Sequence, residues 1–539
     1  MDSNKTPRRR SQKIRGVDYV YEDLPYWDKE VKQTRHKREY IGKLGPNGEF
    51  IPNKKYLARQ QQEQTAEKGA AATTVVPVNR LYYGATYLLD SIGCITGVES
   101  DLKICFPDSY KQILSLAYYL VLESDSPMYR FPRWSHDHRH PYGDVIKSQR
   151  ISELLGTISE ASKMEFFRRQ SVRRLEKEYL AYDTTSVSSY SEYIKIARFG
   201  KNKDGDSLPQ VNLALVFGEE SRLPVYYRKL PGNITDVTTI NKLLKDVKFL
   251  DIKKLKLVMD RGFYSAANLN ALFRHHYKFL IATKCSSELV SGLLDRNRES
   301  IKDFRNYDYD QDVYCVSSTE SWPYVEMDKT GKIIQEGKRR IYVHIYYNGQ
   351  RAEEEKAKFI KKLAQAKQAL LDNECTDEQK SPCEKYFIVK STPKRGISIK
   401  YKDDVIAKKL SNAGYFILLS NEIKDPIEAL SGYRGKDVIE KAFDNLKERL
   451  EMRRTSVESN ENLEGRFFIQ FVGLIYISYL HKLMNEHHLY RNYTMQSLFD
   501  ELDLIERFDY PGQRHHCSEV TKKQKDLYDV LGIKPPNML

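Results

Sequence analysis

Hydrophobic and polar positions change their period along this chain of 539 residues. Between about residues 80 and 175 apolar side chains recur at helical spacing, as in DSYKQILSLAYYLVLE. From residue 178 the pattern is that of strands, EYLAYDTTSVSS, VNLALVFGEE and LPVYYRKLPG, followed by a helical stretch, the apolar run KLKLVMD, another helix and the strand YKFLIATK. Three antiparallel strands followed by alternating helices and strands predict an α/β core, a mixed sheet with flanking helices.

The stretch SGYRGKDVIEKAFDNLKERL, residues 431 to 450, predicts a short glycine-flanked entry followed by a helix with two unlike faces. At helical spacing, four polar side chains fall within roughly a 60° arc: Tyr433, Lys436, Glu440 and Lys447. Apolar side chains fill another face and are expected to pack. A carboxylate between two ammonium groups suits a metal ion beside a phosphate backbone. The alternative is an ordinary amphipathic helix with a solvated face.

Two aspartates stand where strand-like runs end, Asp183 in AYDTTSVSSY and Asp260 in LKLVMDRGFYS. Taken singly, each could be a turn or helix-capping residue. Because Asp183 is expected on the first, central strand and Asp260 near the end of the fourth, adjacent strand, the two carboxylates could meet. With Glu440 they would form a site of three acidic side chains. Oxygen ligands of this kind favour Mg²⁺, with Mn²⁺ as a substitute.

Together these three motifs resemble the DDE transposases of bacterial insertion sequences, in the branch called the insertion-sequence-four family. The signature of that family is Tyr, two residues, Arg, three residues, Glu, six residues, Lys, and the chain matches it at Tyr433, Glu440 and Lys447. Lys436 stands where the family has Arg, which keeps the charge and loses the planar bidentate fork. The resemblance covers about residues 176 to 480.

The resemblance implies an RNase H-like catalytic core and a DNA transposase acting by two-metal catalysis. Asp183, Asp260 and Glu440 would be the catalytic residues and the ligands of two Mg²⁺ ions. The family's reaction is cleavage at the element's ends and attack of the freed 3′-OH on target DNA, by a homodimer on paired double-stranded ends. Further DNA contacts are expected from five residues: Tyr433, Lys436, Lys447, Arg261 and Trp322. For Arg261 an ion pair with an acid, and for Trp322 a buried anchoring role, are the alternatives.

Charge points to the same partner. The formal net charge is +14, and residues 1 to 60 hold 15 Lys and Arg against 8 Asp and Glu. A basic, β-rich start fits a nucleic-acid contact. The seven cysteines form no CxxC pair, which fits a reducing cytosol. The longest apolar stretch, FFIQFVGLIYISYL, is shorter than a membrane span, so we expect a cytoplasmic, nucleoid-associated protein without a membrane partner.

The domain organisation expected from these patterns has six regions. Residues 80 to 175 are compatible with a helix-turn-helix reader of DNA and equally with plain bundle packing. A low-complexity stretch at 59 to 74 is expected as a linker. The expected regions are a basic β-rich DNA-binding module (1–65), a helical DNA-binding or dimerisation region (66–175), a first segment of the RNase H-like core (176–284), a β-rich or mixed insertion (285–412), a second segment of the core (413–482) and a C-terminal tail (483–539).

Two other functions are compatible with the sequence. One is a domesticated DNA-binding protein that no longer cuts, against which the intact set of acidic residues argues. The other is an RNase H-like nuclease without strand transfer. The basic N-terminal region and the insertion favour a protein that recognises specific DNA ends.

Overall fold

The structure is a computed structural model of the whole chain. It describes residues 8–28, 33–46, 48–57, 78–173, 178–250, 255–327, 330, 332–372, 383–392, 396–510 and 514–537. The expected linker at 59–74 lies outside these described residues. The chain divides into two units, Met1–Val78 with Tyr510–Gln513, and Asn79–Asp509 with Arg514–Leu539.

The first unit is built on an antiparallel sheet. Its strands pair in chain order and are β1 (Arg8–Ile14), β2 (Val17–Asp28), β3 (Gln33–Leu44) and β4 (Phe50–Pro52). Most of β3 is exposed, and only Ile41 and Gly42 within it are buried. A sheet this small buries little apolar area, which leaves its basic side chains in solvent.

The second unit contains a large mixed sheet in the order β11-β12-β13-β16-β10-β9-β6-β7-β8. Strands β6, β9 and β10 run parallel, and β7, β8 and β16 pair antiparallel with their neighbours. The central strands are β6 (Leu180–Ser189), β7 (Gln210–Gly218), β8 (Pro224–Pro231), β9 (Lys256–Met259), β10 (Lys278–Thr283) and β16 (Tyr415–Ser420). Helices α8 (Asp236–Phe249) and α9 (Ala266–Arg274) connect β8, β9 and β10.

Both faces of this sheet are buried. On β9 the side chains of Leu257 and Met259 belong to the main hydrophobic core, whereas Val258 belongs to a second cluster under α14 (Pro426–Arg434). The same alternation on β10 sends Leu280 to the α14 side. Because side chains alternate between the faces of a strand, continuous apolar runs such as KLVM are what a doubly covered sheet requires.

The residues between β10 and β16, expected as an insertion, extend this sheet. The long hairpin of β12 (Val313–Met327) and β13 (Ile333–Tyr347) continues it, because β13 pairs with β16. The rest of the segment is α10 (Glu288–Asn297), β11 (Tyr307–Asp308), α11 (Gly349–Leu371), β14 (Phe387–Thr392), β15 (Gly396–Tyr401) and α13 (Asp403–Ser411). A small separate cluster that includes Leu363 and Phe387 joins α11 to β14.

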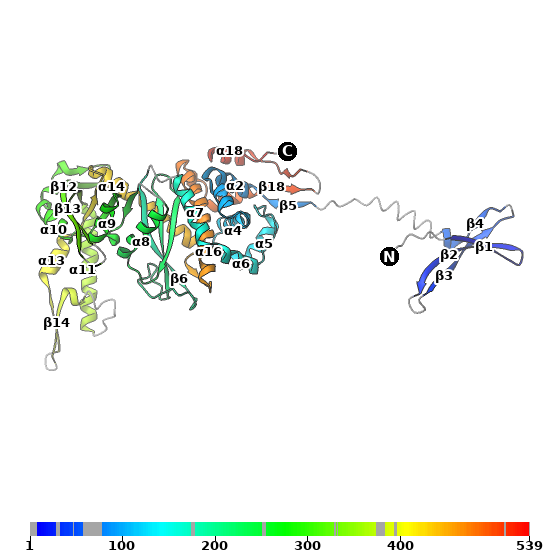
Figure 1. Cartoon of the computed structure of the whole chain (residues 1–539), viewed down its shortest axis with the longest axis horizontal. Helices are drawn as coiled ribbons and strands as arrows, with labels where there is room; N and C mark the ends of the chain where they lie inside the picture. The colour runs from blue at the N-terminus through cyan, green and yellow to red at the C-terminus, as the bar shows by residue number, and fades with distance from the viewer. Residues whose placement is uncertain are drawn as a thin grey trace. The chain divides into compact units, whose positions relative to one another are not determined.

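At the opposite edge, the last helix of residues 84 to 172 contacts β8. The helices of this region lie together on the side of β6 away from β12 and β13 (Figure 1). They are α2 (Gly84–Thr96), α3 (Val98–Cys105), α4 (Tyr110–Leu122), α5 (Phe131–Asp137), α6 (Ser148–Thr157) and α7 (Glu160–Val172). Helix α16 (Asn460–Glu486) contacts α2, α4, α6 and β8 and joins this bundle to the sheet.

Helix α16 contains the apolar stretch FFIQFVGLIYISYL and is longer than it. Its 27 residues are long and apolar enough to cross a membrane, but 78% of its most apolar window is buried inside the protein. Core helices of soluble proteins have the same properties, because a helix covered on all sides must be apolar all round.

The segment 483–539, expected as a C-terminal tail, packs on the helical region. Helix α17 (Met495–Asp503) lies against α2, and β18 (Glu506–Asp509) pairs with β5 (Asn79–Tyr82). From α18 (Lys522–Val530) the buried Tyr528 hydroxyl donates to the Gly84 carbonyl at 2.7 Å. In this polar segment the apolar side chains recur at helical spacing. They therefore lie on one face of each short helix, and that face packs against the helical region.

Candidate active site

Two neighbouring parallel strands place the two aspartates. In the β6–β9 ladder Tyr182 is opposite Met259, so Asp183 and Asp260 are the next residues along adjacent strands. The Asp183 side chain is 15% exposed and accepts the Thr184 backbone N–H at 2.7 Å. Asp260 follows the last residue of β9 and precedes a 3₁₀ turn, Arg261–Phe263. The adjacency expected from the order of the strands is therefore present.

The stretch of residues 431 to 450, expected as a short glycine-flanked entry followed by a helix, forms three helical pieces. Helix α14 ends at Arg434, α15 (Asp437–Asp444) follows, and Asn445–Arg449 form a π-helical turn. Between α14 and α15 the backbone bonds tighten to 3₁₀ spacing, with the Lys436 N–H donating to the Tyr433 carbonyl.

Gly435 lies at the junction of α14 and α15, close to a carboxylate from another segment. A Cβ atom on Gly435 would lie 1.9 Å from Oε1 of Glu219, which follows β7. Glycine therefore lets the helix junction pass close to that carboxylate. This contact is between segments far apart in sequence, so helical periodicity could not show it.

Tyr433, at the end of α14, supports one of the aspartates. Its hydroxyl donates to Oδ1 of Asp260 at 2.7 Å. Burial, followed by the charge and hydrogen bond of Asp260, raises the pKa of Tyr433, so the phenol keeps its proton and acts as a donor. The predicted role of Tyr433 as a DNA contact is untested, and its observed partner is a carboxylate.

Lys436 lies among all three acidic side chains. It is 6% exposed, and its Nζ is 3.2 Å from Oε1 of Glu440. Burial lowers the pKa of Lys436, but the charges of Asp183, Asp260 and Glu440 outweigh burial and raise it. Lys436 is thus a buried ammonium group that offsets the negative charge of the three carboxylates.

The pKa values of the two aspartates move in opposite directions. For Asp183 burial is the largest effect and raises the pKa, although Lys203 and Lys436 act against it. For Asp260 burial is opposed by the Tyr433 hydrogen bond and by Lys436 and Arg261, and the net effect lowers the pKa. Asp260 is therefore held more firmly as a carboxylate than Asp183.

Glu440 differs from both aspartates because its side chain is 61% exposed. Within the stretches of the chain that the structure describes, no three His, Cys, Asp or Glu side chains form a group that could hold a metal ion as they stand. The structure brings the three predicted carboxylates around one ammonium group, with Glu440 at the outer side.

The other predicted DNA contacts have varied surroundings. The Lys447 ammonium donates to both carboxylate oxygens of Asp204, at 2.6 and 2.7 Å, and its side chain is 10% exposed. Arg261 is exposed beside Asp260. Trp322 is 4% exposed, and its Nε1 donates to Oδ1 of Asn270 on α9 at 2.8 Å. For Trp322 this burial favours the anchoring alternative over base stacking.

Sequence reasoning missed Lys203, which reaches the site from the segment between β6 and β7. Its Nζ lies 3.4 Å from Oδ1 of Asp183 and 3.0 Å from Oγ1 of Thr184, and it also donates to the Thr184 carbonyl. The Thr184 hydroxyl in turn donates to Oδ1 of Asp236 at 2.6 Å. The stretch KNKDGD has the composition of a polar turn, so no sequence signal pointed to the site.

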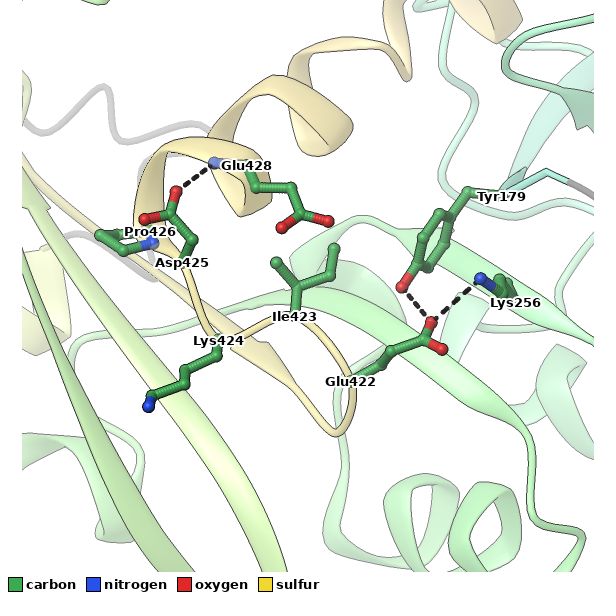
Figure 2. Close-up of a pocket in the computed structure, with 8 residues that line it drawn as sticks. All are labelled: Tyr179, Lys256, Glu422, Ile423, Lys424, Asp425, Pro426 and Glu428. Atoms are coloured by element: carbon green, nitrogen blue, oxygen red, sulfur yellow. Dashed lines mark hydrogen bonds and ion pairs between the residues drawn. The ribbon is translucent and has the colours of Figure 1, made fainter.

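A separate hollow of about 590 Å³ lies where β6 and β9 begin, and the three carboxylates do not line it (Figure 2). There Glu422 accepts from the Tyr179 hydroxyl at 2.5 Å and is 3.4 Å from Nζ of Lys256. Asp425 caps α14 by accepting backbone N–H groups at its start. Glu422, Lys256 and Asp425 therefore all have partners within the protein, and these contacts join α14 to the start of β6 and β9.

Comparison with known protein families gives the class of the protein. The model of the family described as "Transposase DDE domain" matches residues 175–475, more than half of the chain, and the chain therefore belongs to that family. No curated protein matches the chain. Among solved structures it is similar to "Cryo-EM structure of piggyBac transposase synaptic complex with hairpin DNA", with 10% sequence identity and a TM-score of 0.32 over 72% of this chain and 68% of that chain.

Proposed function

We propose that this transposase binds the ends of its own insertion sequence, cleaves phosphodiester bonds with divalent metal and joins the 3′-OH ends to target DNA. We place it in the insertion-sequence-four branch through Tyr433, Lys436, Glu440 and Lys447. The observation that carries the proposal is the adjacency of Asp183 and Asp260 on parallel strands, with the Tyr433 hydroxyl from the segment that carries Glu440 bonded to Asp260. The sheet order β10-β9-β6-β7-β8, with β6 to β8 antiparallel, supports an RNase H-like core.

The residues present fit divalent metal by the chemistry of their donor set. Asp183, Asp260 and Glu440 offer carboxylate oxygens, the ligands that Mg²⁺ prefers and Mn²⁺ accepts. Two such ions would activate water and stabilise charge at phosphorus and on the leaving oxygen. Lys436 neutralises the same carboxylates, so Glu440 would exchange this partner for metal. The positive charge of Lys436 then remains available for a phosphate oxygen.

The other side chains prepare the site. Tyr433 orients Asp260 through its hydroxyl and keeps that carboxylate ionised. Arg261, exposed next to Asp260, is placed to contact a phosphate of the bound strand. Lys447 holds the segment that carries Lys203, whose ammonium group lies beside Asp183.

Double-stranded DNA is the proposed partner. The first unit concentrates exposed basic side chains on its sheet, including Lys37 and Arg38 on β3. Positive charge in this amount supports phosphate contacts that are independent of base sequence. A homodimer acting on paired ends, and a place in the cytoplasm with the nucleoid, belong to the same proposal.

The proposal is tested with the inverted repeats that should flank the reading frame. A labelled duplex carrying one repeat is incubated with the wild-type protein and with Asp183→Ala, Asp260→Ala and Glu440→Ala at one fixed salt concentration. We expect Mg²⁺-dependent nicking and strand transfer by the wild type and loss in all three variants. DNA binding, titrated without metal, should persist because the carboxylates are not needed for it.

The possible outcomes separate the three functions. Cleavage that persists in two of the variants would reject the three carboxylates as the catalytic set. Binding without any cleavage by the wild type would favour the domesticated binder. Nicking without joined products would favour a nuclease that lacks strand transfer.

A further inference from the structure

The segment between β6 and β7, residues 190–209, exposes aromatic rings among basic side chains. We name it the β6–β7 connection. Tyr193 is 75% exposed and Phe199 is 72% exposed. Lys195, Arg198 and Lys201 are exposed in the same segment. Single exposed rings are common on protein surfaces, but rings interleaved with lysine and arginine are the pattern that binds single-stranded nucleic acid.

The first half of the β6–β7 connection is firmly attached, so its exposed rings are not those of a loose loop. Ile194 and Ala197 are buried, at 2% and 8% exposure. Arg198 and Gln210 exchange two backbone hydrogen bonds of 3.0 Å, and the Gly232 N–H donates to the Ile196 carbonyl. Ile194 and Ala197 therefore point inward, whereas Tyr193 and Phe199 face solvent. A preorganised ring loses little conformational entropy when a base stacks on it.

The second half is fixed to the catalytic region. Asp204 is paired with Lys447 at 2.6 Å, and Asp206 is paired with Arg454 at 2.9 Å. Since both aspartates are engaged by partners outside the connection, its outward side is left mainly basic. Lys203, between them and Phe199, lies 3.4 Å from Asp183. Phe199 is therefore four residues along the chain from a side chain that contacts Asp183.

Two other aromatic side chains are less suited to contact a base. The Tyr190 hydroxyl accepts from Nη1 of Arg454 at 2.7 Å, and its ring faces the same guanidinium group. Trp322 is buried against Asn270. Tyr193 and Phe199 therefore remain as the accessible rings of this region.

We propose that the β6–β7 connection is a binding surface for unpaired bases of the DNA strand that enters the candidate active site. Phe199 and Tyr193 stack on bases, and Lys195, Arg198 and Lys201 contact the phosphates between them. Lys447 acts on this surface as a positioning residue, through Asp204. This inference rests on the proposed function, because the strand it binds is the one that the three carboxylates would cut.

The test compares two labelled DNAs of the same length without metal: a blunt duplex, and a fork with single-stranded oligo(dT) arms. Phe199→Ala should weaken binding to the fork by roughly 5- to 100-fold, the range for losing one base–aromatic stack. Binding to the blunt duplex should change by no more than about twofold, as for an ordinary surface substitution. Phe199→Trp should restore the preference for the fork, and Tyr193→Ala should reduce it.

Matched controls come from two exposed rings elsewhere in the second unit, Phe304 at 81% and Tyr309 at 86% exposure. Phe304→Ala and Tyr309→Ala should leave both affinities unchanged. Equal losses on both DNAs, or unchanged affinity of Phe199→Ala for the fork, would overturn the proposal. A variant that alters the monomer–dimer distribution by light scattering and leaves DNA affinity intact would assign the rings to contact between copies of the chain.

Failure of this inference is distinguishable from failure of the proposed function. The binding test contains no metal and needs no cleavage. A wild type that prefers the fork but never nicks the element's ends would support the proposed binding surface and contradict the proposed enzymatic function. If the wild type nicks its ends and Phe199→Ala binds the fork as tightly as the wild type does, the enzymatic function is supported and the binding surface is contradicted.

Discussion

The candidate active site has a strand half and a helix half, and the two are held differently. Asp183 and Asp260 are on adjacent parallel strands, where the backbone ladder fixes their separation. Glu440 is on the short helix α15, exposed and paired with Lys436. The strand half is preorganised by the sheet, whereas the helix half depends on side-chain contacts that metal or DNA can replace. We therefore expect substitutions in the helix half to show how the site changes between its free and loaded states.

The largest effect is expected from Lys436, the ammonium group that joins the two halves. Lys436→Met leaves three carboxylates without their buried counter-charge and should lower the free energy of unfolding by about 3 kcal/mol in EDTA. Ca²⁺ should recover part of this loss because it supplies the missing positive charge. Urea unfolding with and without Ca²⁺ measures both effects.

Two variants control for that experiment. Lys436→Arg retains the charge and should retain most of the stability. Lys441→Met, at an exposed position of the same helix, should change stability by less than about 0.5 kcal/mol. A Lys436→Met protein as stable as the wild type in EDTA would show that the lysine does not hold the two halves together.

A smaller effect is expected where the helix half supports the strand half directly. Tyr433→Phe removes the hydroxyl that donates to Asp260 at 2.7 Å. A hydrogen bond to a charged group contributes about 1.5 to 3 kcal/mol, and we expect a loss near the lower value. In a double-mutant cycle Asp260→Asn should account for most of the same energy. Additive losses would mean that the two side chains are not coupled.

The smallest effect concerns Glu219, whose carboxylate lies at the Gly435 junction. Burial is the main cause that raises the pKa of Glu219 from 4.5 to about 7. Between these two pH values the folded protein binds more protons than the unfolded chain, so stability falls as pH rises. Glu219→Gln removes this dependence and should be more stable than the wild type by about 1 kcal/mol at pH 8, after allowance for partial exposure.

The advantage of Glu219→Gln should vanish as the pH is lowered to 4.5, where the wild-type carboxyl is protonated in the folded protein and half-protonated in the unfolded chain. Thermal unfolding of the two proteins at pH 5 and pH 8 measures the change. An equal difference between variant and wild type at both pH values would contradict the assignment.

The same division explains what the sequence could predict. The strand half follows partly from local pattern: an apolar run ends at Asp260, and the order of the elements makes the two strands neighbours. Asp183 was expected where its strand-like run ends, but it lies within β6, which continues to Ser189. The placement of Lys436 and Glu440 on one helical face also followed from periodicity. The glycine-flanked entry before this helix was expected as well, whereas the close approach of Glu219 to Gly435 was not, because Glu219 comes from another region of the sheet.

Long-range pairing also limited the remaining predictions. Lys203 is in a turn-like sequence and reaches Asp183 only because Lys447 and Arg454 hold its neighbours. The burial of Trp322 depends on α9 packing against β12. Neither contact has a local signal, since both join residues that are distant in sequence. The pairing of β13 with β16 makes the insertion a continuation of the sheet. This pairing also joins residues that are distant in sequence, so it has no local signal.

The central claim is that Glu440, in the helix half, becomes a metal ligand together with the two strand aspartates. Replacing it by cysteine exchanges a hard oxygen ligand for a softer sulfur, which Mn²⁺ accepts more readily than Mg²⁺. The measurement is the initial rate of nicking of a duplex carrying the element's inverted repeat by Glu440→Cys and wild type, in Mg²⁺ and in Mn²⁺. Loss of nicking in Mg²⁺ with recovery in Mn²⁺ is the predicted result. Full activity of Glu440→Cys in Mg²⁺ would contradict the claim.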